Sequence, residues 1–288
     1  MTDWHSFARY LSAKRTIDDR ALNLRVWQTL RENLPHRNPL RVLEVGGGIG
    51  TMVERLAEWG FADTAVQYTL LDADPANIAT AEKRLSAKKL PPSFRVDFAA
   101  MEMLAFAETQ SAPRWDALIA HAVLDLVDIR RALPPLLSLL APDGIFYFTL
   151  NFDGVTIFEP EIDAKFEALL MARYHRTMDE RMVAGNRAGE SRMGRRLLSL
   201  LPQLGGEILA AGASDWIVFA QSGGYPADEA YFLHFIIETV HNALKNDPAV
   251  DSKKLSAWTE KRHAQIETGE LVYLAHQLDI TGRKRKTA

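Results

Sequence analysis

The stretch Arg41–Gly50, RVLEVGGGIG, constrains the fold of this chain more than any other. Its first half contains the apolar residues Val42, Leu43 and Val45, which is typical of a buried strand. Its second half is rich in glycine, and apolar residues then recur at helical spacing over Thr51–Trp59. A strand, a glycine turn and a helix form the first half of a βαβ unit, whose helix start offers free N–H groups to a ligand. The stretch therefore predicts an α/β fold with a ligand at this turn.

Glu44 restricts the kind of ligand. A dinucleotide site has the pattern G-x-G-x-x-G, with a pyrophosphate at the helix start. Here the third glycine of that pattern falls at Thr51, and the Glu44 carboxylate would repel a pyrophosphate. The same carboxylate suits a ligand that carries an amino acid group and no phosphate. The alternative is an ordinary glycine turn that binds nothing.

A second motif follows the next predicted strand, Gln67–Leu71. This strand ends in Asp72-Ala73-Asp74-Pro75, about twenty residues beyond the glycine turn, before a helix over Ala76–Leu85. An acid at this place can accept hydrogen bonds from both hydroxyls of a ribose. Asp72 is the better candidate, because Asp74 is placed to cap the helix that starts at Pro75.

The runs E-x-G-x-G-x-G at Glu44–Gly50 and D-x-D-P at Asp72–Pro75 resemble class I S-adenosylmethionine (SAM) dependent methyltransferases. Trp115-Asp116 and the turn Ala141–Gly144 before an apolar run extend the resemblance over roughly Arg41–Phe152. It implies an α/β, Rossmann-like doubly wound sheet, mostly parallel with one antiparallel strand, and SAM as the cofactor. The cofactor-binding residues that it implies are Glu44, Gly46, Gly48, Gly50, Asp72, Ala73, Asp97, Phe98 and His121.

Asp97 and Phe98 close the predicted third strand, Phe94–Phe98. The family commonly places an acid there, beside the adenine amino group. Phe98 would lie against the adenine ring or be a core aromatic.

The remaining segments are expected to add helices to the core. We expect a helical cap (residues 1–36), a SAM-binding core (37–158), a lid-like insertion (159–191), a helix and sixth strand of the core (192–222), a helical insertion (223–268), and a final strand with a basic tail (269–288). In the family the final strand inserts antiparallel between the fifth and sixth, and Leu271–Gly282 suits it. The cap would cover the cofactor, where Arg15 or Arg20 could meet the methionine carboxylate.

The acceptor should bind beyond the fourth and fifth strands, because ligands of open α/β sheets bind at the carboxyl ends of strands. Candidate substrate residues there are Asp125, Asn151 and Asp153, joined by Arg192 from the arginine-rich segment Arg173–Arg196, which could act as a lid. His121 ends the predicted fourth strand and is the candidate catalytic base, with an ionisation expected between about pH 6 and 7.5. The alternative for His121 is a packed, hydrogen-bonded structural histidine.

Composition limits the other possibilities. The absence of cysteine excludes a Cys-ligated zinc site and a cysteine nucleophile, and no spacing suggests another metal site. A net charge of −3 argues against broad nucleic-acid binding. With no apparent signal peptide or membrane-spanning run, we expect a cytoplasmic protein, which could be an oligomer.

The sequence therefore favours methyl transfer to an O or N atom of a small-molecule acceptor. Two alternatives stay open. One is a methyltransferase acting on RNA or protein through the arginine segment and the basic tail. The other is a SAM-binding regulatory or scaffold protein without turnover.

Overall fold

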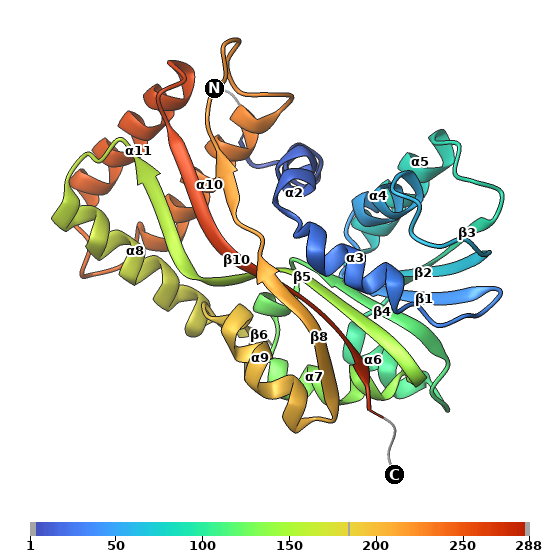
Figure 1. The fold of residues 1–288 in the computed structure, drawn as a ribbon. Helices are drawn as coiled ribbons and strands as arrows, with labels where there is room; N and C mark the ends of the chain where they lie inside the picture. The colour runs from blue at the N-terminus through green and yellow to red at the C-terminus, as the bar shows by residue number, and fades with distance from the viewer. Residues whose placement is uncertain (1–3, 184, 286–288) are drawn as a thin grey trace.

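The computed structural model describes residues 4–183 and 185–285. Its main sheet consists of β1 (Leu40–Val45), β2 (Val66–Asp72), β3 (Phe94–Ala100), β4 (Trp115–His121), β5 (Leu140–Glu159), β8 (Gly206–Ala213), β9 (Trp216–Val218) and β10 (Val272–Lys284). The strand order is β3-β2-β1-β4-β5-β10-β8, with β9 also paired to β10 (Figure 1). Strands β1 to β5 pair in parallel, whereas β10 pairs antiparallel with β5, β8 and β9. The predicted Rossmann-like sheet with an inserted antiparallel strand is confirmed.

Helices cover both faces of the sheet. One face packs against α6 (Met103–Thr109), α7 (Ile129–Ser138) and α9 (Met193–Gln203), and the other against α3 (Leu24–Glu32), α4 (Thr51–Glu58) and α5 (Pro75–Ala87). Successive strand residues point to opposite faces, so Phe146 of β5 joins the first core and Tyr147 joins the second. This alternation explains the continuous apolar sequence of the central strands.

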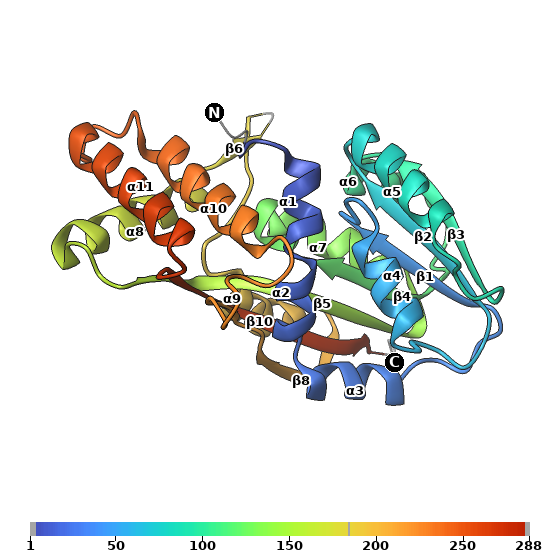
Figure 2. The ribbon, with the colours of Figure 1, turned by 90° about the horizontal axis from the view of Figure 1, so that it is seen from above.

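A third core unites segments that lie far apart in the sequence. The N-terminal helices α1 (Phe7–Ala13) and α2 (Arg15–Ala21) pack with α8 (Ala164–Asp179), α10 (Glu229–Leu244) and α11 (Ser252–Glu267). Figure 2 shows α1 between α10 and the side of the sheet that carries α4. Helix α1 thus bridges the glycine turn and the C-terminal helices.

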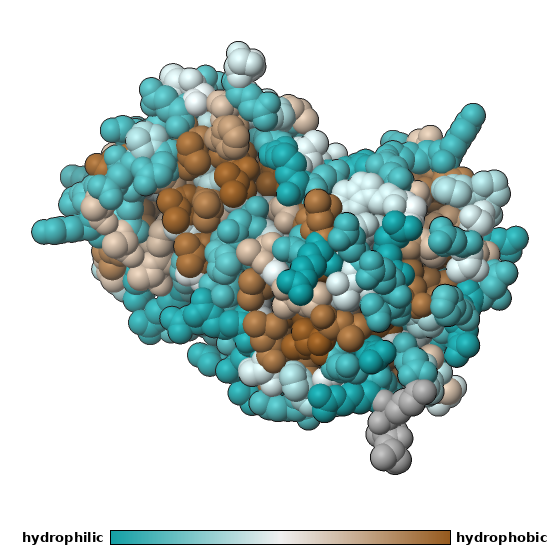
Figure 3. Space-filling view, in the orientation of Figure 1, coloured by the Kyte–Doolittle hydropathy of each residue, from teal (hydrophilic) through white to brown (hydrophobic). Residues whose placement is uncertain are grey.

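Strand β5 is unusually long. It runs from Leu140 to Glu159, because the first residues of β10 pair with its last residues. One face of this extension packs on the third core, whereas Ile157, Leu274 and Ile217 lie next to one another on the other face. Figure 3 shows an apolar patch over the far ends of these strands.

Two small segments complete the fold. A hairpin of β6 (Met182–Val183) and β7 (Asn186–Arg187) follows α8, within the predicted lid-like insertion, and η1 (Leu124–Leu126) follows β4. The predicted basic tail reaches residues 286–288 and the predicted cap begins at residues 1–3, both outside the described ranges.

Candidate active site

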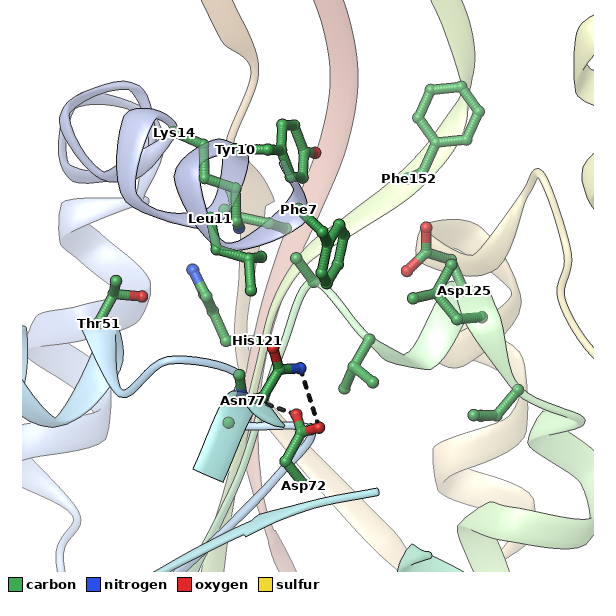
Figure 4. Close-up of a pocket in the computed structure, with 18 of the residues that line it drawn as sticks. Phe7, Tyr10, Leu11, Lys14, Thr51, Asp72, Asn77, His121, Asp125 and Phe152 are labelled. Carbon is green, nitrogen blue, oxygen red and sulfur yellow. Dashed lines mark hydrogen bonds between the residues drawn. The ribbon is translucent and has the colours of Figure 1, made fainter. Parts of the chain in front are cut away.

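A cavity of about 490 Å³ lies at the carboxyl ends of β1, β2 and β4. Its size is within the roughly 300–1,000 Å³ of small-molecule sites. The glycine turn forms one end of the cavity, and side chains from α1, β5, α8 and α10 line the other. Figure 4 shows Asp72 and Asn77 at one side, Phe7 and Tyr10 of α1 across from them, and Asp125 with Phe152 farther along. The cavity therefore has a half at the glycine turn and a half between the added helices.

The glycine turn leaves its end of the cavity free of side chains. Gly46, Gly47 and Gly48 all line the cavity. Gly46 has a φ of +66°, and a Cβ there would lie 2.4 Å from Val123 Cγ2, so no other residue fits without rearrangement. Gly50 lies outside the cavity: it precedes α4 with a φ of +80° and packs on Leu85. Gly50 thus turns the chain into α4, and its contact with the cofactor stays a prediction.

Asp72 lies at the end of β2 and joins the glycine turn to α5. Its Oδ2 accepts a hydrogen bond of 2.8 Å from Gly48 N, and its Oδ1 accepts from Asp74 N and from Asn77 Nδ2. Asp74 caps α5 as predicted, accepting from Ala76 N. Asp72 and Ala73 both line the cavity, where the carboxylate keeps acceptor capacity for ligand hydroxyls.

Glu44 is 1% exposed and lines the cavity from β1. Its Oε2 accepts a 2.8 Å hydrogen bond from the Tyr68 hydroxyl. Burial raises the pKa of Glu44 to about 8, although the Tyr68 hydrogen bond and the Arg55 charge favour the ionised form. A cation beside Glu44 would restore its ionisation, because the opposite charge favours the carboxylate.

His121 also lines the cavity, but both of its ring nitrogens are engaged. Nδ1 lies 2.8 Å from Thr149 Oγ1, and Nε2 lies 3.1 Å from Asp18 Oδ2. Burial lowers the pKa of His121 to about 4, outweighing the hydrogen bond to Asp18. The predicted base with an ionisation between about pH 6 and 7.5 is therefore corrected: the side chain matches the structural alternative.

The partner of His121, Asp18, is the centre of a buried network. Its carboxylate also accepts hydrogen bonds from Lys14 Nζ (3.0 Å) and Trp216 Nε1 (2.9 Å). Burial alone would raise the pKa of Asp18, but Lys14, His121 and Arg55 together hold it well below its usual range. The network links α2 to β4 and β9 and so fixes the wall of the cavity beneath α1.

Lys14 is a site residue that sequence reasoning missed. It lines the cavity with 5% exposure, whereas the expected carboxylate partners, Arg15 and Arg20, are paired elsewhere. Arg15 binds Glu54 and Glu58, and Arg20 binds Glu229. No local signal separates Lys14 from these neighbours, because only the packing of α1 and α2 decides which cation faces the cavity.

Asp97 and Phe98 lie outside the cavity, which corrects their expected contacts with adenine. Strand β3 continues to Ala100, so Asp97 is an exposed mid-strand residue that accepts a hydrogen bond from Gln67. Phe98 is a partly buried core aromatic. Met101, Glu102 and Met103 line the cavity instead. Glu102, an acidic residue shortly after β3, is the sequence feature that could have indicated this segment.

Of the four predicted substrate residues, only Asp125 lines the cavity. Asn151 and Asp153 point to the other face of β5, because Leu150 and Phe152 take the cavity face and directions alternate along a strand. Asp153 forms an ion pair with Arg195 there. Arg192 lies beside a separate pocket next to α7. Asn151, Asp153 and Arg192 are thus corrected as substrate residues.

Among residues 4–183 and 185–285, no group of three or more histidine, aspartate or glutamate side chains could hold a metal ion. In the same part of the chain, no helix is long and apolar enough to cross a membrane.

Comparison with known proteins identifies the domain. Residues 43–146 match the family model of a methyltransferase domain. A candidate type II methyltransferase from Anaeromyxobacter dehalogenans has a TM-score of 0.55 at 19% identity, covering 92% of this chain and 97% of that one. The YcgJ protein from Bacillus subtilis has a TM-score of 0.50 at 13% identity, covering 92% and 100%. No curated protein matches the sequence. The structural likenesses establish the fold, and the family match lies over the glycine turn and its following strands.

Proposed function

We propose that this chain is a class I SAM-dependent methyltransferase that methylates an O or N atom of a small molecule, because its residues 43–146 match the family model of a methyltransferase domain. The supporting observation is the form of the cavity, which continues past the glycine turn into a space lined by α1, β5, α8 and α10. A small molecule fits such a space, whereas an RNA strand or a protein segment needs an open groove. The insertions at residues 159–191 and 223–268 are proposed to form this acceptor side.

The residues of the glycine-turn half fit SAM. Gly48 lines the cavity with no side chain, and a Cβ there would lie 3.3 Å from Leu11 of α1, so the turn and α1 leave a narrow slot. Glu44 would hold the ammonium group, Lys14 the carboxylate, and Asp72 the ribose hydroxyls. Met101 and Met103 would lie against the adenine ring. When bound, SAM supplies a methyl group activated by its positive sulfur.

The chain's own contribution is positioning and exclusion of water. His121 is held by Asp18 and Thr149, and we propose that it orients the floor of the site instead of moving a proton. The aromatic residues of α1 and α10 pack together above it: the rings of Tyr10 and Phe235 are stacked with centroids 4.2 Å apart. Such a dry site suits displacement at a sulfonium, in which charge is dispersed.

The arginine segment supports the small-molecule proposal over the RNA alternative. Arg173 forms an ion pair with Asp247, Arg176 with Glu180, and Arg196 with Glu190, so these guanidinium groups already have acidic partners. Together with the net charge of −3, this leaves little excess positive charge for phosphates.

Thermal unfolding with SAM or S-adenosylhomocysteine tests the cofactor part. Both ligands should raise the melting temperature in a concentration-dependent way, as any ligand that binds the folded state does. A panel of small amines and alcohols, with single-stranded RNA and a mixture of unfolded proteins as controls, should then yield S-adenosylhomocysteine only with a small molecule. Methylation confined to RNA or protein would refute the acceptor class. Ligand-induced stabilisation without turnover on any substrate would favour a regulatory protein.

A further inference from the structure

The acceptor half of the cavity contains a carboxylate oxygen without a hydrogen-bond partner. Asp125 follows β4 in the short helix η1, and its Oδ1 is buried without a hydrogen bond. Among the described residues, no lysine, arginine or histidine forms an ion pair with it. A buried acceptor oxygen without a donor costs stability, on the order of 1–3 kcal/mol or more for a charged group. Such a buried unsatisfied group calls for an explanation, and a bound ligand or ion is one.

Hydrogen bonds hold the main chain around Asp125 in place. Glu190 N donates to Asp125 O over 3.2 Å, and Gly189 N donates to Val127 O over 3.1 Å. The segment after the β6–β7 hairpin is therefore tied to the η1 turn. Gly189 has a φ of +120°, and a Cβ there would lie 2.9 Å from Met178 O and 3.1 Å from Asp125 O. This close approach fixes the backbone of Asp125 against the segment after the hairpin.

The groups around Asp125 are mainly aromatic. Tyr10 of α1, Tyr174 of α8 and Phe152 of β5 line the same cavity, and Figure 4 shows the Asp125 carboxylate on the side of Phe152. Burial raises the pKa of Tyr174 to about 12, and the Asp125 charge adds to the effect. Burial raises the pKa of Tyr10 further, and the charges of Asp18 and, less strongly, Asp125 add to the effect. Both tyrosines are therefore neutral near pH 7 and present polarisable ring faces.

The charges that face Asp125 are few. Burial raises the pKa of Asp125 to about 6, while its own backbone amide, Arg181 and Lys14 lower it. Lys14 already binds Asp18, and Arg181 makes no ion pair with Asp125 within 4.0 Å. Above about pH 7 the carboxylate is thus ionised, and it forms no ion pair although Arg181 and Lys14 line the same cavity. A second buried acceptor on the cavity wall, Gln277 Oε1, also lacks a donor.

We propose that this half of the cavity binds an organic amine, with the ammonium group against Asp125 and an aromatic or other apolar body among Tyr10, Phe152 and Tyr174. An ammonium group supplies both the missing donor and the missing positive charge, and aromatic faces attract cations. A neutral alcohol would donate a hydrogen bond but leave the charge uncompensated. The inference rests on the proposed function, because it identifies the acceptor as an amine. For nitrogen to be the methylated atom, the bound ammonium group would first give one proton to the Asp125 carboxylate, which frees the nitrogen lone pair.

Binding, measured by calorimetry on the full chain, tests this without turnover. The probes are matched pairs: phenethylamine with 2-phenylethanol, and tryptamine with tryptophol, each with S-adenosylhomocysteine present and absent. The amines should bind wild-type protein about 10- to 100-fold more tightly than the alcohols, as a charge-assisted hydrogen bond predicts. Asp125→Asn should remove this preference by weakening amine binding alone. Asp97→Asn, which removes an exposed carboxylate outside the cavity, should retain it.

The pH dependence provides a check that needs no variant. Amine affinity should fall as the pH is lowered through about 6, where Asp125 becomes protonated while the amines stay charged. Equal binding of amine and alcohol, absence of binding by both amines, or a preference that survives in Asp125→Asn would overturn the inference. S-adenosylhomocysteine binding distinguishes failure of the amine assignment from failure of the proposed function. If S-adenosylhomocysteine binds and the protein does not prefer amines over alcohols, only the amine assignment fails. If S-adenosylhomocysteine does not bind, the proposed function itself is refuted.

Discussion

Cofactor binding should release a proton from Glu44. With a pKa of about 8, roughly nine in ten Glu44 carboxyls carry a proton at about pH 7 before the ligand binds. An ammonium group placed against Glu44 in the buried site favours the ionised carboxylate, and its pKa should return towards the ordinary value of 4.5. The full shift of 3.5 units corresponds to at most about 5 kcal/mol of coupling between the two charges.

The assay is calorimetric titration of S-adenosylhomocysteine in buffers with different ionisation enthalpies. It carries the same ammonium group as SAM, so about 0.9 proton should be released per ligand near pH 7 and about half a proton near pH 8. Glu44→Gln, which keeps the shape of the side chain and cannot ionise, should release almost none and bind more weakly. Equal proton release by both proteins, or none from the wild type near pH 7, would refute the assignment of Glu44 to the ammonium group.

Three further predictions test the site and its frame. Asp72→Asn should weaken S-adenosylhomocysteine binding by about 1–3 kcal/mol, while Asp97→Asn leaves the calorimetric affinity unchanged; equal losses would restore Asp97 to the site. Gly46→Ala should lower the free energy of unfolding in urea by more than Gly60→Ala, since both have positive φ but only Gly46 lacks room for a Cβ. The third concerns His121, whose pKa is about 4 when folded and 6.5 when unfolded: the unfolded state binds more protons between these values, so stability falls as the pH is lowered through this window. His121→Asn should flatten that fall, and parallel wild-type and variant curves would contradict the assignment.

Local backbone chemistry made much of the fold predictable from the sequence. The turn after β1 needs residues without a Cβ, and Gly46 shows why: its positive φ and its contact with Val123 exclude any side chain. Asp74 before Pro75 caps α5 through an atom two residues away. These requirements involve only a few neighbouring residues, so a single sequence displays them. The antiparallel insertion of β10 followed from the family resemblance.

Several residues that the sequence predicts for the cofactor lie on this frame. Glu44, Gly46, Gly48, Asp72 and Ala73 line the cavity because each lies at or just beyond the carboxyl end of a parallel strand, which is where such sheets bind ligands. Asp125 reaches the cavity for the same reason, since it follows β4.

The tertiary structure decided which side chains face the site and which have partners. His121 meets Asp18 from 103 positions away, and Trp216 reaches the same carboxylate from 198 positions away. Asn151 and Asp153 point away from the cavity because side chains alternate along β5, whose pairing with β10 continues past them. Likewise, the packing of α1 and α2 sends Lys14 into the cavity and Arg15 to Glu54. Burial and pairing depend on such distant contacts, so no pattern of neighbouring residues records them.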